Sequence, residues 1–90
     1  MTKQHKFGDR VPMMNKGEFV YRGQVKVGGT RCEYWREIKG PGSALRFITP
    51  AGEAMGHHLE TAAIHYWPDT AAAMQAFDMF TLKGELPASA

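Results

Sequence analysis

Three of the four histidines of the chain lie in one short stretch, beside an adjacent tyrosine and tryptophan. His57, His58 and His65 all belong to the segment MGHHLETAAIHYWPD, residues 55–69. Imidazole is a common metal ligand and a common general base in proteins. This segment is therefore the first place where a metal site or a catalytic centre could be built.

The spacing of these histidines does not favour a metal site in either regular structure. In a strand, His57 and His58 point to opposite faces, and His65 lies roughly 26 Å from His57. In a helix, His58 and His65 share a face about 10 Å apart, whereas helical ligand pairs are spaced by three or four residues. A tetrahedral zinc site would need Cys32 or His5 to be brought in by the fold. We predict ordinary histidines, with no metal ion and no cofactor.

Other patterns that carry catalytic chemistry are weak or missing. The sequence has no phosphate-binding loop, no dinucleotide fingerprint and no nucleophile elbow. Cys32 falls on a strand face that we assign to the core, which favours a buried thiol over a nucleophile. Glu33 and Glu37 would lie about 13 Å apart along a strand, too far for a glycosidase pair. We predict that the protein is not an enzyme; the enzymatic alternative is a general base at His57, His58 or His65, in a cleft that an oligomer would have to provide.

The composition indicates one small domain. A chain of 90 residues is long enough for one domain, and the only cysteine fits a reducing compartment. No apolar run reaches the ~20 residues that a membrane span needs, and the polar start has no apolar core of a signal peptide. We expect a cytoplasmic protein with no membrane contact.

Alternating residues predict most of the elements that would position a site. Residues 1–17 read as a basic N-terminal arm with a short strand near residues 9–14, and residues 18–90 read as one α+β domain. FVYRGQVKV alternates at period two, which places Phe19, Tyr21, Val25 and Val27 on one face of a half-buried strand. Gly28 and Gly29 then form a hairpin turn into TRCEYWREIK, and ALRFIT follows as a third strand.

The rest of the chain divides into an ambiguous stretch and a helix. TPAGE, residues 49–53, is typical of a turn, and residues 55–67 suit either a helix or a strand; the β-branched and aromatic residues favour a strand over 61–67. A helix is predicted over 70–83, capped by Asp69 and ended by Gly84. Its inner face would carry Met74, Phe77 and Phe80.

These elements predict an α+β fold. We expect an antiparallel β-sheet of four to five strands with one C-terminal α-helix packed on it. The alternative is a tightly curled sheet that approaches a barrel.

Positive charge gathers in the first half of the chain. Residues 1–50 hold ten Lys or Arg against four acids, whereas residues 51–90 hold one against five. A turn at the two glycines would place Lys26 opposite Arg31 and Arg22 opposite an outward-facing Trp35. A Lys opposite an Arg is unfavourable unless an anion lies nearby, and an exposed indole suits contact with a partner. The predicted binding residues are Arg22, Lys26, Arg31, Trp35, Lys39 and Arg46.

Such a face predicts a small non-enzymatic protein that binds a nucleic-acid backbone. The cations would contact phosphates, and the indole would stack on a base or wedge between bases. The alternative is a protein–protein interaction module, such as a small phage or mobile-element inhibitor or adaptor, with the same tryptophan as its anchor. A homodimer is a further possibility.

Two short patterns resemble known families. YRG at 21–23, REIKGP at 36–41 and the segment 69–84 are similar to the sheet and helix of the plant ethylene-response-factor DNA-binding domain, which reads DNA with Arg and Trp on its sheet. That likeness covers about half of the chain, and some thirty residues separate its last strand from its helix, where the family has far fewer. FGDRV at 7–11, GQV at 23–25 and IHYWP at 64–68 resemble strands of small Src-homology-type barrels, which include the plasmid-borne dihydrofolate reductases. The reductase active-site motif is not reproduced, so neither family nor its activity is assigned.

Overall fold

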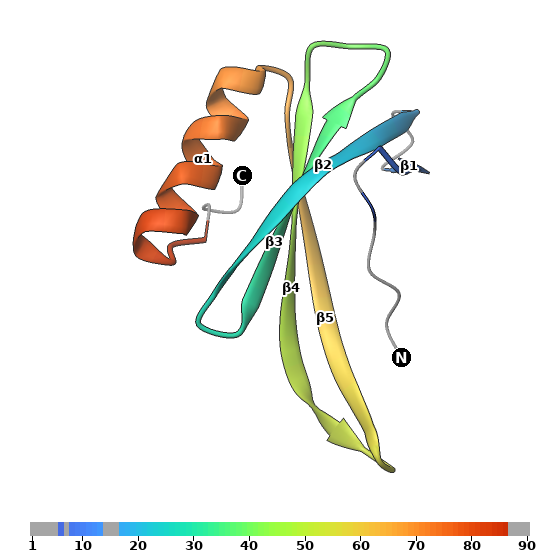
Figure 1. The fold of residues 1–90 in the computed structure, drawn as a ribbon, viewed down its shortest axis with the longest axis vertical. Helices are drawn as coiled ribbons and strands as arrows, with labels where there is room; N and C mark the ends of the chain where they lie inside the picture. Colours follow the sequence, from blue (N-terminus) through green and yellow to red (C-terminus); the bar gives the residue numbers. More distant parts are fainter. Residues whose placement is uncertain (1–5, 7, 14–16, 87–90) are drawn as a thin grey trace.

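The computed structural model describes residues 6, 8–13 and 17–86. These residues form five antiparallel strands and one helix, and the strands pair in sequence order as a single curled sheet with the helix packed on one face (Figure 1). The elements are β1 (Arg10–Pro12), β2 (Glu18–Val27), β3 (Thr30–Glu37), β4 (Ser43–Ala54), β5 (His57–Trp67) and α1 (Thr70–Lys83). The predicted α+β fold is confirmed.

The predicted N-terminal strand is present in β1. Residues 1–5, 7 and 14–16 of the predicted arm lie outside the described residues. No helix in the part of the chain that the structure describes is long and apolar enough to cross a membrane.

The helix α1 begins and ends at the predicted caps. The Asp69 carboxylate accepts a hydrogen bond from the backbone N–H of Ala71 at 3.0 Å. Gly84 adopts the left-handed conformation and donates its N–H to the carbonyl of Phe80 at 2.7 Å. Both bonds satisfy backbone groups that a helix end leaves unpaired.

The inner face of α1 differs from the prediction at one residue. Ala73 and Phe80 are buried and Phe77 is half-buried, but Met74 is exposed. Met74 follows Ala73 by one residue, which rotates it about 100° around the helix axis, away from the line through Ala73, Phe77 and Phe80. The prediction that Met74 packs inward is therefore wrong.

The helix covers one face of the sheet, which we call the helix face. There Phe80 packs against Cys32, Leu45 and Phe47, with the Phe47 and Phe80 rings edge-to-face at 5.2 Å. This cluster is the first of two apolar cores.

The thiol of Cys32 should react only when the protein unfolds. Cys32 is fully buried, and burial, followed by the negative charge of Glu33, raises its pKa from 9.0 to about 12. A native sample at pH 8 should therefore release almost no chromophore from an aromatic disulfide reagent, and a guanidinium-unfolded sample should release one equivalent. An Ala54→Cys variant, which adds an exposed thiol, should react at once. Fast reaction of the native wild type would contradict the burial of Cys32.

The same group makes stability depend on pH. Between pH 9 and 12 the unfolded chain has lost the Cys32 proton while the folded chain retains it. The folded state then binds more protons, so the free energy of unfolding falls as pH rises through this window.

A β-bulge in β2 changes which residues share a face. Opposite β3, the pairs from Val27↔Thr30 to Gln24↔Glu33 follow the predicted register, but the register then shifts between Tyr21 and Gly23. Arg22 is the extra residue, and Gly23 takes the positive φ of 137°. One extra residue reverses the alternation along the rest of a strand.

The reversal places Tyr21, rather than Arg22, opposite Trp35. Phe19 and Tyr21 therefore leave the face of Val25 and Val27, where the alternation had placed them, and lie on the opposite side of the sheet. We call this side the far face.

A second apolar core lies on the far face. It consists of Met13, Phe19, Tyr21, Trp35 and Ala44, with Val11 and Tyr66 packed against it. Trp35 is 0% exposed, and its ring meets that of Tyr21 edge-to-face at 5.2 Å. The prediction of an outward-facing indole is wrong, because curling gives the far face an interior of its own.

The chain reverses later than predicted after β4. Residues 49–53, predicted as a turn, continue β4, and the turn lies at Met55 and Gly56, whose φ angles are 50° and 81°. Two consecutive left-handed residues are what a tight type I′ hairpin needs. Residues 57–67 form one strand, so the strand predicted over 61–67 is confirmed and is four residues longer.

Candidate functional site

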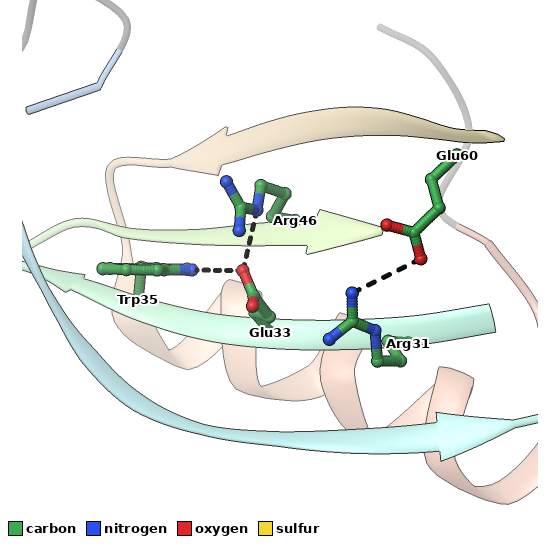
Figure 2. Close-up of polar contacts among 5 residues, drawn as sticks. All are labelled: Arg31, Glu33, Trp35, Arg46 and Glu60. Atoms are coloured by element: carbon green, nitrogen blue, oxygen red, sulfur yellow. Dashed lines mark hydrogen bonds and ion pairs between the residues drawn. The ribbon is translucent and has the colours of Figure 1, made fainter. Parts of the chain in front are cut away.

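A buried carboxylate organises the polar side chains of the far face. Figure 2 shows Glu33 between Trp35 and Arg46, with Arg31 and Glu60 beside them. Glu33 is only 1% exposed; its Oε1 accepts from the Trp35 Nε1–H at 3.1 Å and from the Arg46 Nε–H at 2.7 Å. The Arg46 guanidinium also lies 5.9 Å from the centre of the Trp35 ring. A carboxylate is retained in such a position when charge and hydrogen bonds compensate its desolvation.

A second ion pair, whose carboxylate is far more exposed than Glu33, lies next to this cluster. Arg31 Nη2 is 3.5 Å from Glu60 Oε2, joining β3 to β5. Arg31 and Arg46 are thus each engaged by a carboxylate of the chain itself. Their charge is locally balanced, which weakens the attraction of either side chain for a phosphate.

Two tyrosines on the far face are held neutral. Tyr66 donates its hydroxyl hydrogen to Glu37 Oε1 at 2.7 Å, and this bond, then burial and the charge of Glu37, raises the pKa of Tyr66. Burial is the largest cause that raises the pKa of Tyr21, followed by the charge of Glu33. Both phenols therefore act as hydrogen-bond donors, or as apolar rings, at neutral pH.

The predicted binding residues come together only in part. Lys26 lies opposite Arg31 as predicted, and Arg46 lies on the same face one strand further along. Arg22 is the extra residue of the bulge, and Lys39 lies in the loop after β3. Trp35 lies beneath the surface, where it cannot stack on a nucleobase.

The histidines of β5 do not converge, because His57 and His58 are neighbours on opposite faces of the strand and His65 lies seven residues further along. His57 and His58 are exposed, and His58 Nδ1 is 3.5 Å from Glu53 Oε2. His65 is half-buried, with its ring 5.7 Å from that of Phe47 and stacked 6.0 Å from that of Trp67. Among the described residues, no three His, Cys, Asp or Glu side chains are grouped to hold a metal ion.

The most exposed feature of the fold is the outer part of the β4–β5 hairpin. Pairing between β3 and β4 ends at Arg31↔Ile48, so residues 49–61 continue as a two-stranded ribbon, which we call the arm. Figure 1 shows this ribbon extending beyond the other strands and away from α1. Every residue from Pro50 to Ile64 is exposed. An isolated two-stranded ribbon is marginal in water, so an arm of this length suits contact with a partner.

The edges of the sheet differ in how they are protected. The edge at β1 is three residues long and contains Arg10 and Pro12, and the part of β2 beyond β1 carries two cations and the bulge after Tyr21. The outer edge of β4 contains Pro50 and a register shift before Gly52. Short strands, prolines, cations and bulges all discourage pairing with another chain. β5 has eleven residues with no Pro, Lys or Arg, and each of them pairs with a residue of β4, because the extra residue of the bulge lies in β4. It is the least protected edge in the described part of the chain.

The sequence contained one signal for the β4–β5 hairpin that the turn prediction concealed. Pro50 and Gly52 are typical of a turn, yet Gly56 and the alternation after it are equally typical of a hairpin. The bulge between Pro50 and Gly52 lets both residues lie within β4.

Comparisons with protein families, with curated proteins and with solved structures found no match to this chain.

Proposed function

We propose that the protein is a non-enzymatic protein-binding module that takes a strand of its partner onto the β5 edge. The observation that carries this proposal is the contrast between β5 and the other edges of the sheet, which short strands, prolines, cations or bulges protect. In strand addition, backbone hydrogen bonds provide affinity and alternate side chains provide specificity.

β5 supplies both components. Its eleven residues present backbone groups along one side, and residues 57–64 are exposed on both faces. Leu59 is 46% exposed and Ile64 40%, and the alternation of the strand places them on opposite faces. An added strand would cover apolar side chains on each side of the sheet.

Charge also favours a protein over a nucleic acid at the arm. Residues 49–64 contain Glu53 and Glu60 and no Lys or Arg, so this ribbon would be repelled by phosphates. Binding of a nucleic-acid backbone by the far-face cations stays a prediction, and it would have to compete with the ion pairs of Arg31 and Arg46. We retain a cytoplasmic location as part of the proposal, since the single buried thiol suits a reducing compartment.

The test is capture from lysate with a matched pair of variants. Ala63→Lys puts a cation in the middle of the β5 edge, and Ala54→Lys puts one on the arm but in β4. Ala63→Lys should lose the partners that the wild type captures, and Ala54→Lys should keep them, with nuclease treatment making no difference. Mass spectrometry identifies the captured proteins, and circular dichroism checks that each variant folds.

A different pattern would support the nucleic-acid alternative. Capture would then disappear on nuclease treatment and in a Lys26→Glu variant, would weaken by orders of magnitude between low and moderate salt, and would survive in Ala63→Lys.

A further inference from the structure

We infer that the strand added to β5 is β5 of a second copy of this chain, paired antiparallel about a two-fold axis. This inference rests on the proposed function and names its partner. The result would be one continuous sheet of ten strands, five from each copy.

The edges that a second copy can offer lead to this arrangement. Its β1 edge is three residues long with a proline, its β2 edge beyond β1 has two cations and a bulge, and its outer β4 edge has a proline and a bulge. Pairing of β5 with any of these edges would also be head-to-tail and would leave another β5 open, which extends into a filament. Pairing of β5 with β5 uses the same edge twice and closes at two copies.

The length of β5 selects the register. Antiparallel pairing of the whole strand, His57–Trp67, is centred on its middle residue, so Ala62 lies opposite Ala62 of the second copy. Ala63 then lies opposite Thr61, and Ile64 opposite Glu60. The numbers of two paired residues differ by an even number in this register, so both residues lie on the same face of β5. The far face of one copy therefore continues the far face of the other. The two-fold axis passes through small side chains, which allows the strands to approach.

The charges on β5 are compatible with this register. Glu60 is the only Asp or Glu in the strand. The two copies of Glu60 would lie about 13 Å apart along the strand direction, because each faces Ile64 of the other copy. Like charges therefore do not meet across the two-fold axis, where they would destabilise the pair.

The number of backbone bonds is sufficient for a stable contact. In an antiparallel pair, about half of the residues exchange two hydrogen bonds each, so eleven paired residues form about ten bonds. A typical protein–protein interface contains a similar number of direct hydrogen bonds.

Cysteine crosslinking tests the register directly. Ala62→Cys would put two thiols opposite each other, at a Cα separation of about 4.5–5.5 Å that a disulfide can span. Ala54→Cys is the matched control, because Ala54 pairs with His57 and the two copies of His57 would lie about 33 Å apart. The native Cys32 is buried and does not compete. Mild oxidation should convert Ala62→Cys, but not Ala54→Cys, to a covalent dimer on a non-reducing gel.

Charge swapping tests the two-fold axis in solution. Light scattering should give a wild-type mass of about twice the 10.0 kDa chain. Ala62→Lys alone and Ala62→Glu alone should each weaken the dimer on the order of a hundredfold, because like charges meet at the axis. An equimolar mixture of the two variants should dimerise again, which a variant that simply fails to fold would not do.

A monomeric wild type that forms no Ala62→Cys crosslink at tens of micromolar would overturn the inference. A dimer that crosslinks through Ala54→Cys instead would overturn it as well. Neither result would contradict the proposed function, which fails only if Ala63→Lys leaves unchanged the set of captured proteins, further copies of this chain included.

Discussion

Replacing Trp35 with alanine is expected to lower the free energy of unfolding by about 3–5 kcal/mol. The indole is fully buried in the far-face core, where it contacts Tyr21 and donates to Glu33. Its removal leaves a large cavity and takes one hydrogen bond from a buried carboxylate. Small domains have only about 5–15 kcal/mol in total, so the variant should be close to unfolded at 37 °C. Urea denaturation followed by circular dichroism measures the difference.

Two variants separate the packing of the indole from its hydrogen bond. Trp35→Phe retains most of the ring and loses the Nε1–H, so it should cost about 1–3 kcal/mol, the value of one hydrogen bond to a charged group, while Glu33 keeps the bond from Arg46. Trp67→Ala removes the other tryptophan, which is half-buried, and should cost clearly less than Trp35→Ala. If Trp35→Ala were no more harmful than Trp67→Ala, Trp35 would lie at the surface, as the alternation alone had suggested.

Replacing Arg46 with methionine is expected to cost about 2–3 kcal/mol. Arg46 provides the shortest hydrogen bond to Glu33, at 2.7 Å, and its removal leaves a buried negative charge without its cation. Removing one partner of a buried ion pair costs about 3–5 kcal/mol. Arg46 is partly exposed, so we expect a cost at the lower end of this range or slightly below it. Urea denaturation at neutral pH provides the measurement.

The matched control for Arg46 is Arg31. Both arginines lie on the far face and both are ion-paired, but Glu60 is exposed and 3.5 Å away. Arg31→Met should therefore cost less than about 1 kcal/mol. Replacing both Glu33 and Arg46 with methionine should recover most of the stability lost in Arg46→Met, because no unpaired charge remains. Equal costs for the two single arginine variants would mean that the Glu33 pair is no more protected from water than the Glu60 pair.

Much of the fold could be predicted because it depends on local conformation. The hairpin at Gly28 and Gly29 needs positive φ angles, and the cap at Asp69 needs a short acceptor side chain. The pairing of Lys26 with Arg31 followed from that hairpin alone. The strand over 61–67 followed from its β-branched and aromatic residues.

The candidate site was harder to predict because it depends on contacts between distant residues. Arg46 lies thirteen positions after Glu33. No spacing rule connects residues so far apart, so the ion pair that balances the negative charge of Glu33 was not predicted. The open edge of β5 also has no local signature, since a strand is an edge only if nothing pairs with its other side.

By itself, the sequence determined most of the antiparallel strands, the turn at Gly28 and Gly29 and the capped helix, because these are set by residues within a few positions of each other. Only the tertiary structure decided which faces are interior. A single extra residue at Arg22 reverses the alternation of β2 and turns Phe19 and Tyr21 toward Trp35. The curl of the sheet then encloses the Trp35 indole. The strands pair in sequence order, so β5 is the last strand of the sheet and its outer edge stays open. That order is a property of the whole chain and cannot be read from any one segment.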